Sequence, residues 1–143
     1  MKNVLFLLSG LFLLSSCQDQ LKTDIDLIEE FLAENGIDAE MDESGLFYTI
    51  DTEGNGEFPT VNDEVTVNYR GTLLEDGQEF DAGNNVTFPL GGVIRGWQIG
   101  IPKLSKGGSG RLYIPSELAY GTRALNGIPA NSVLIFDVDL LDF

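Results

Sequence analysis

The chain of 143 residues is long enough for one compact domain with short attachments, and its hydrophobic content of 43% is sufficient for a core. Its formal net charge of −15 opposes binding to a phosphate backbone and argues against a nucleic-acid partner. The sequence has no histidine and a single cysteine, Cys17, which excludes a Ser-His-Asp triad, a Cys-His pair, a histidine metal site and an intrachain disulfide, and no cofactor or metal is expected.

The first segment has the pattern of an export signal. Lys2 is followed by an apolar run from Val4 to Leu14, which as a helix would be roughly 16 Å long, well short of the ~30 Å core of a membrane. The pattern predicts a signal peptide over residues 1–16 rather than a membrane-spanning helix. The Leu-Ser-Ser-Cys sequence that ends at Cys17 resembles a bacterial lipoprotein signal, which implies cleavage before Cys17 and a lipid on its thiol. A small-residue cleavage site that includes a cysteine by chance is the alternative.

A lipid anchor would hold the mature chain in the bacterial cell envelope outside the cytoplasm, at the outer membrane or the periplasmic face. Acyl chains contribute ~0.8 kcal/mol per buried CH₂, so several chains together give stable attachment. Any activity there has to proceed without ATP or NADPH.

A helix is predicted after the signal. Residues 18–23 are expected to form a short tether, and residues 24–35 a helix that begins at Thr23 or Asp24 as N-cap and ends before Gly36. We expect its apolar stripe to pack on the body of the same domain, and a homodimer through this helix is the alternative that the pattern leaves open. The stripe recurs at helical spacing, at Ile25, Ile28, Phe31 and Leu32.

Most of the remaining chain alternates apolar and polar residues like β-strands. Residues 44–51 are predicted as an edge strand, and residues 64–74 as a longer strand followed by a hairpin turn at Asp76-Gly77. Further strands are predicted at 109–115 and 132–143.

An antiparallel sheet with one apolar face needs a cover. The candidate within this part of the chain is a short helix around Val93–Ile99, which contains Trp97, the only tryptophan. We therefore expect the segment with Trp97 to lie across the concave side of the sheet.

Four segments together resemble the FKBP-type peptidyl-prolyl isomerase family: "VTVNYRGTLLEDGQEFDAG", "FPLGGVIRGW", "ELAYG" and "LIFDVDLL". The resemblance runs from about Phe58 to Leu141 in the order and spacing of that family. It implies an α+β fold in which a strongly twisted antiparallel sheet wraps around one short helix, with an apolar pocket between them and an extra N-terminal helix. The chain then divides into a signal peptide over 1–16, a tether and helix over 17–43, and an isomerase domain over 44–143.

The resemblance also implies the residues that carry the reaction. Trp97 matches the pocket floor, the Asp81 carboxylate orients neighbouring groups, and the Tyr120 hydroxyl faces the bound peptide. The residues implied as catalytic are Tyr69, Phe80, Asp81, Trp97, Tyr120 and Phe136.

Substrate-binding roles are implied for a second set, which comprises Phe88, Val93, Ile94 and Ile128. The backbone N–H of Ile94 would bond a substrate carbonyl, since the start of a helix leaves N–H groups free. Ile128 would lie over the pocket rim, and Gly96 is expected to keep the backbone on the substrate side uncrowded.

Two features depart from the family pattern. Val86 stands where macrolide-binding members often have an aromatic residue, so one wall of the pocket is expected to be shallower. The loop over 122–132 is one residue shorter than in the form used for comparison. Both departures affect substrate preference and drug affinity more than the basic activity.

The implied activity is rotation of X–Pro bonds in exported polypeptides, which needs neither a covalent intermediate nor a proton transfer. The expected partners are proline-containing polypeptides. The alternative is a non-catalytic binding module or holdase chaperone that grips prolyl segments in the same pocket.

Overall fold

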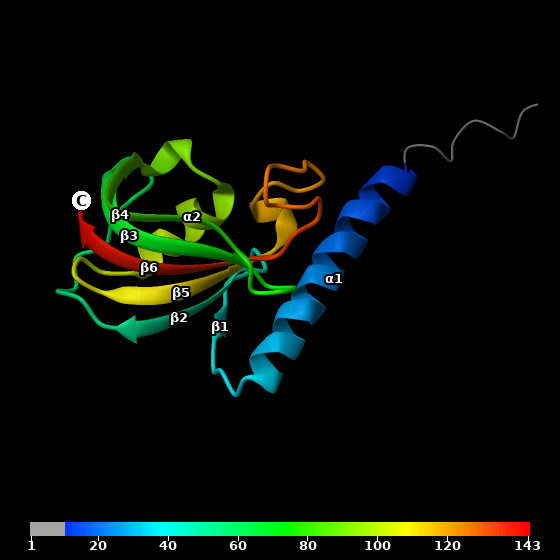
Figure 1. Ribbon diagram of the computed structural model, residues 1–143, viewed down its shortest axis with the longest axis horizontal. Helices are drawn as coiled ribbons and strands as arrows, with labels where there is room; N and C mark the ends of the chain where they lie inside the picture. The colour runs from blue at the N-terminus through cyan, green and yellow to red at the C-terminus, as the bar shows by residue number, and fades with distance from the viewer. Residues whose placement is uncertain (1–10) are drawn as a thin grey trace, which may run out of the picture.

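The computed structural model describes the backbone of residues 11–143 and the side chains from Gln18 onward. Residues 1–10 of the expected signal peptide lie outside this part. The domain is an antiparallel six-stranded sheet in the order β1-β2-β5-β6-β3-β4 (Figure 1). The strands are β1 Glu40–Met41, β2 Phe47–Thr52, β3 Glu64–Leu73, β4 Glu79–Pro89, β5 Ser109–Ile114 and β6 Leu134–Asp142. The helices are α1 Leu11–Glu34, α2 Arg95–Gly100 and the 3₁₀ turns η1 Leu90–Gly92, η2 Ile101–Lys103 and η3 Ser116–Leu118.

The hairpin between β3 and β4 forms at the predicted turn. Gly77 has φ of +73°, which glycine adopts without strain, and the Leu73 N–H donates to the Gln78 carbonyl at 3.0 Å. The strand expected at the edge, β2, is the second strand of the sheet. The edge itself is the short β1, which follows α1 in the chain and pairs with β2.

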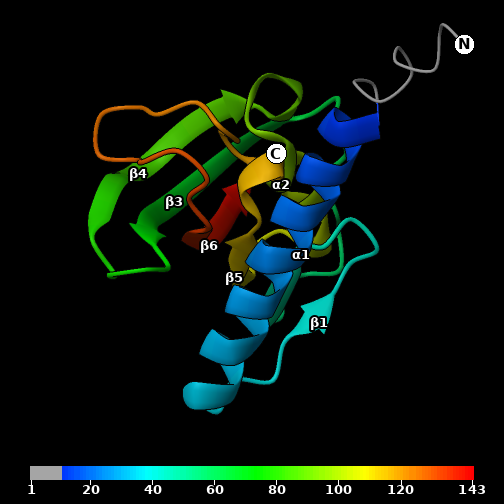
Figure 2. The same cartoon turned by 90° about the vertical axis from the view of Figure 1, so that its right-hand side faces the viewer.

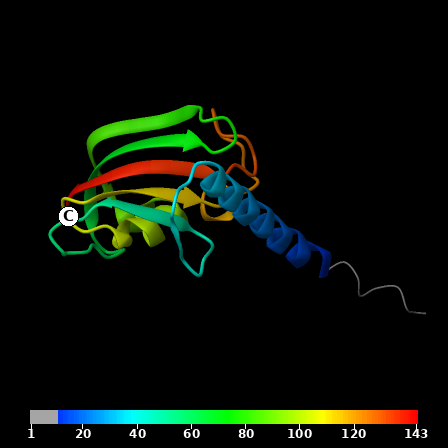
Figure 3. The same cartoon turned by 90° about the horizontal axis from the view of Figure 1, so that it is seen from below.

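The main core lies between the sheet and α2, which crosses one face of the sheet as expected (Figure 3). The alternating inward side chains of β6 belong to this core, namely Leu134, Phe136, Val138 and Leu140. Gly96 does not have the expected position, since it faces the sheet. A Cβ atom there would lie 2.5 Å from Cγ2 of Ile114, so glycine allows α2 to approach β5 closely.

The N-terminal helix α1 is longer than predicted. It begins at Leu11, so residues 18–23 are helical rather than a tether, and Thr23 bonds back to the Asp19 carbonyl at 2.9 Å from inside the helix. The expected N-cap at Thr23 or Asp24 is therefore wrong. The end of the helix is as predicted, since Gly36 has φ of +62° and the Ile37 N–H donates to the Leu32 carbonyl at 2.9 Å, as in a Schellman cap.

The apolar stripe of α1 packs on its own domain, which confirms the favoured expectation. Because side chains alternate across a strand, Tyr113 and Ile135 point to the face opposite the main core. There they form a second core with Ile28 and Leu32 of α1. The helix passes in front of the sheet in Figure 2, and its N-terminal half runs away from the strands in Figure 3. Within the described residues, no helix combines the length and the apolar content needed to cross a membrane.

Candidate active site

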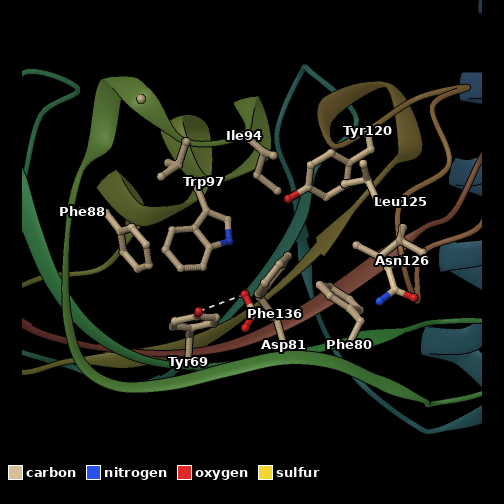
Figure 4. A pocket seen from close by; sticks show the side chains of 13 residues that line it. Tyr69, Phe80, Asp81, Phe88, Ile94, Trp97, Tyr120, Leu125, Asn126 and Phe136 are labelled. Atoms are coloured by element: carbon tan, nitrogen blue, oxygen red, sulfur yellow. Dashed lines mark hydrogen bonds between the residues drawn. The ribbon is translucent and has the colours of Figure 1, made fainter.

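A hollow of about 530 Å³ opens between α2, the sheet and the segment after β5 (Figure 4). It brings together all ten residues expected as catalytic or substrate-binding, and three more. Its lining consists of Tyr69, Phe80, Asp81, Phe88, Gly92, Val93, Ile94, Trp97, Tyr120, Leu125, Asn126, Ile128 and Phe136.

The indole of Trp97 forms the floor and is held edge-on by three aromatic rings. Tyr69 and Phe136 each have their ring centroid 5.3 Å from the indole, and Phe88 has its centroid at 5.6 Å, with interplanar angles of 80° to 90°. Edge-to-face contacts of this kind fix the orientation of a ring. Trp97 is 4% exposed and lines the hollow, so its indole is packed among these rings at the boundary of the cavity.

The indole N–H of Trp97 is buried and has no hydrogen-bond partner among the described residues. Figure 4 shows the nitrogen turned toward the hollow. An unsatisfied N–H costs free energy unless a ligand, a water molecule or an aromatic face meets it.

Tyr69 and Asp81 are joined on one wall by a hydrogen bond. The Tyr69 hydroxyl donates to Oδ2 of Asp81 at 2.9 Å (dashed in Figure 4). Burial, and after it this hydrogen bond to a carboxylate, raises the pKa of Tyr69 to about 12. The phenol therefore stays protonated at every physiological pH.

Phe80 and Phe136 meet edge to face at 5.5 Å on the neighbouring wall, over Gly71 of β3. A Cβ atom on Gly71 would lie 2.6 Å from Cζ of Phe80 and 2.8 Å from Cε1 of Phe136. Sequence reasoning missed Gly71 as a supporting residue. The signal was a glycine in the interior of a strand with several β-branched residues, which often marks a close approach.

Ile94 is the N-cap of α2. Its carbonyl accepts the N–H groups of Trp97 at 3.0 Å and Gln98 at 3.2 Å, whereas its own N–H takes no part in the hydrogen bonds of the helix. The Gln98 side chain donates to the Val93 carbonyl at 2.9 Å and holds this segment in place. The Ile94 N–H therefore lies before the first turn of α2, and Ile94 is one of the residues that line the hollow.

The segment after β5 forms the remaining rim. The backbones of Leu125 and Ile128 bond to each other at 2.9 and 3.1 Å around Gly127, whose φ is +81°. This tight turn buries Ile128 and leaves Leu125 exposed. Figure 4 shows the Tyr120 hydroxyl pointing into the hollow and Asn126 beside Phe80. The sequence did not indicate Leu125 and Asn126, because the conformation of this loop depends on its turn, and the sequence pattern does not predict that turn.

Val86 lies on β4 opposite Val67 and is half-buried. It is not part of the lining of the hollow within the side chains that the structure describes. The shallower wall expected at Val86 stays a prediction.

The chemistry of the hollow is that of an apolar cup. Within residues 18–143 no cluster of three or more cysteine, aspartate or glutamate residues is placed to hold a metal ion. The polar groups around the cup are hydroxyls, one exposed carboxylate, the Asn126 side-chain amide and backbone N–H groups. Such an arrangement can bind a flat, uncharged ring and bond the carbonyl groups beside it.

Comparison with known proteins agrees with this geometry. The profile of the family "FKBP-type peptidyl-prolyl cis-trans isomerase" matches residues 55–141. The isomerase FkpA of Escherichia coli (strain K12) is 48% identical over 118 residues, which cover 80% of this chain and 43% of FkpA. The isomerase Mip of Coxiella burnetii is 44% identical over 103 residues, which cover 68% of this chain and 44% of Mip. The chain thus spans less than half the length of these curated relatives.

Solved structures match the fold as well. The crystal structure of Escherichia coli FkpA has a TM-score of 0.75 at 43% identity and covers 90% of this chain and 61% of that one. A peptidyl-prolyl cis-trans isomerase from Pseudomonas syringae has the same TM-score at 31% identity and covers 87% of this chain and 93% of that one. Since the family profile matches more than half of the sequence, the chain belongs to the FKBP-type peptidyl-prolyl cis-trans isomerase family.

Proposed function

We propose that this chain is a peptidyl-prolyl cis-trans isomerase that accelerates rotation of X–Pro bonds in exported polypeptides. The observation that carries the proposal is the hollow floored by Trp97 and walled by Tyr69, Phe80 and Phe136 in a chain of this family.

The reaction suits an apolar cup. An X–Pro bond rotates over a barrier of about 18–20 kcal/mol because amide resonance gives its C–N bond double-bond character. Resonance is lost when the bond is twisted, and the amide oxygen then carries less negative charge. A site that excludes water disfavours the planar, polar amide relative to the twisted one, which is differential binding of the transition state.

The proposed roles follow from the positions of the side chains. The prolyl ring lies on the Trp97 indole between the aromatic walls, and the Ile94 N–H bonds a carbonyl of the peptide. The Tyr120 hydroxyl, which lies near Ile94 in Figure 4, bonds the peptide from the rim, and Asp81 fixes the Tyr69 ring through its hydroxyl. No step moves a proton or forms a covalent bond, in keeping with a site that lacks histidine and a reactive thiol.

A protease-coupled assay with an X–Pro peptide tests the proposal on the purified full chain. We expect Trp97→Ala and Phe136→Ala each to lower kcat/KM at least about tenfold, or about 1.4 kcal/mol in the barrier. Phe58→Ala is the matched control, because Phe58 is 53% exposed and lies outside the hollow. A wild-type rate equal to the uncatalysed rate would end the enzyme proposal and leave binding of prolyl segments, as in a holdase, as the function of the cup. Unchanged kcat/KM in both pocket variants would remove the assignment of the site.

We also propose that the mature chain is lipid-anchored through Cys17 in the cell envelope. The support is the apolar run that ends in Leu-Ser-Ser-Cys and the use of the only cysteine at that position. Metabolic labelling with a radioactive fatty acid, followed by membrane fractionation, tests it against Cys17→Ala. Label and membrane association should both be lost in the variant, and an unlabelled wild-type chain would contradict the anchor.

A homodimer through the mature part of α1, from Cys17 onward, is a companion proposal, since the N-terminal half of this helix runs clear of the sheet (Figure 3). Sedimentation at increasing concentration tests it. A mass that rises with concentration supports the dimer, and a constant monomer mass contradicts it.

A further inference from the structure

Asp24 is a buried carboxylate outside the candidate active site. It lies on the inner stripe of α1, where its neighbours one helical turn away on either side are Leu21 and Ile28, and its exposed fraction is 0%. A carboxylate in such a place is costly unless donors surround it. The structure supplies such donors, so Asp24 makes a specific polar contact within an apolar interface.

The donors come from two elements. Oδ2 of Asp24 accepts the backbone N–H of Ser116 at 2.8 Å and also the Ser116 hydroxyl. Oδ1 accepts the side-chain amide of Gln20 at 2.8 Å, from one turn earlier in α1. The carboxylate therefore ties the N-terminal helix to η3, 92 residues further along the chain, and η3 lies beside α1 in Figure 2.

Ser116 in turn holds the backbone around Tyr120. Its carbonyl accepts the N–H of Ala119 at 3.0 Å and that of Gly121 at 2.7 Å, so the two neighbours of Tyr120 are both bonded to one residue. The Gly121 carbonyl then accepts the Asn131 N–H at 2.8 Å, which closes the base of the loop that carries the rim of the hollow. A continuous series of hydrogen bonds thus runs from Asp24 to the wall that presents the Tyr120 hydroxyl.

We propose that Asp24 is a positioning residue of the active site, which sets Tyr120 and the rim loop through Ser116. The proposal rests on the isomerase function proposed above. In Asp24→Asn one of the two acceptor oxygens becomes an NH₂ donor, so the donors of Ser116 and Gln20 cannot all be met in the observed arrangement, and η3 is freed to shift. Small displacements of a group that orients the substrate lower the rate strongly, even when the altered residue is remote from the chemistry.

The variants Asp24→Asn and Ser116→Ala test the proposal in the full chain. Asp26→Asn is the matched control, because it makes the same charge change on the same helix at an exposed carboxylate that pairs with Lys22. The assays are run at a temperature where circular dichroism shows all variants folded. We expect Asp24→Asn and Ser116→Ala each to lower kcat/KM at least about fivefold, and the double variant to fall no further than the lower single variant, since contacts in one network are not additive. Asp26→Asn should stay within about twofold of wild type.

Amide hydrogen exchange, resolved by NMR, supplies a readout that general destabilisation would not give. In Asp24→Asn the amides of Gly121 and Asn131 should exchange at least about tenfold faster, while those of β3 and β6 stay unchanged. A folded Asp24→Asn with kcat/KM within about twofold of wild type and unchanged exchange at Gly121 overturns the proposal. A uniform rise in exchange across the sheet also overturns it, because that result means a purely structural role. If Asp24→Asn does not fold, Ser116→Ala is judged by the same two measurements.

The two proposals fail in different ways. If the wild type shows no catalysis, the isomerase function is refuted. If the Gly121 amide nevertheless exchanges faster in Asp24→Asn, the link from Asp24 to the rim is still supported. If the wild type is active, and Asp24→Asn has the kcat/KM and the Gly121 exchange of the wild type, the link is refuted and the proposed function is unaffected.

Discussion

Tyr69 contributes to the site both through its ring and through its hydroxyl. The ring packs against Trp97 and Phe88, and the hydroxyl donates to Asp81. Because the ring contacts are independent of the hydroxyl, replacing tyrosine by phenylalanine removes the hydrogen bond and keeps the wall. A Tyr69→Phe variant therefore measures the contribution of the hydroxyl separately from that of the ring.

We expect kcat/KM to be flat between about pH 6 and about pH 9, because no proton moves in the reaction and the Tyr69 hydroxyl, with a pKa of about 12, stays protonated. Tyr69→Phe should lower kcat/KM about fivefold at every pH in this range, the equivalent of one hydrogen bond of about 1 kcal/mol. The pH profile of the coupled assay checks both statements, and a bell-shaped wild-type profile would contradict them.

The same variant tests the linkage of Tyr69 to folding. Its pKa in the folded chain is raised above the ordinary value of 10.0, so its contribution to stability is complete below about pH 10 and is lost as the pH rises toward 12. Urea unfolding of wild type and Tyr69→Phe should therefore converge over this alkaline range.

At the scale of elements, α1 is part of the domain because its stripe completes a second core. Ile28 is fully buried against β2, β5 and β6, whereas its neighbour Leu27 is 43% exposed. We expect Ile28→Ala to lower the free energy of unfolding by about 2–4 kcal/mol, through lost burial and the cavity left behind. Leu27→Ala is the control and should cost less than about 1 kcal/mol. Urea denaturation measures both, and equal effects would show that the stripe is not seated on the sheet.

The elements that sequence could predict are those with local signals. The alternation around Val65 and Val67, the Asp-Gly turn at 76–77 and the stop at Gly36 each depend on near neighbours, and the structure has them where expected. The start of α1 was misjudged because Asp24 looks like an N-cap, whereas its partner Ser116 is distant in sequence. Only the tertiary fold shows that this carboxylate is inside the helix.

The site follows the same rule. Its aromatic residues were identified through the family resemblance, and the structure gathers them around one hollow. Gly96 was expected on the substrate side of α2, whereas it faces the sheet. A glycine in a short helix does not indicate which neighbouring surface approaches it. Gly71 was missed for the same reason, since the crowding rings come from two other strands.

At the scale of the whole molecule, the net charge of −15 makes the few well-placed cations important. Asp42 accepts the Ser44 N–H at 3.0 Å and pairs with Lys103 at 2.9 Å, so it joins the segment after β1 to η2. The hydrogen bonds from the Ser44 backbone and side chain, followed by Lys103, lower the pKa of Asp42 to about 2.

Because the pKa of Asp42 in the folded chain is below its ordinary value of 3.8, its contribution to stability is complete above about pH 4 and is lost as the pH falls toward 2. We expect Asp42→Asn to reduce the free energy of unfolding by about 1–2 kcal/mol at neutral pH and to differ little from wild type near pH 2. The exposed Asp38→Asn is the control with the same charge change. A gap between Asp42→Asn and wild type that persists to pH 2 would contradict the assignment.

The lone tryptophan has a practical consequence for the whole chain. Because the only indole lies at the floor of the hollow, light absorbed selectively by indole is emitted from that one place. Its emission maximum reports the polarity of the cup, and a prolyl ring that displaces water from it would shift the spectrum without any turnover. Occupancy of the site can thus be titrated optically, with no label added and with catalysis measured separately.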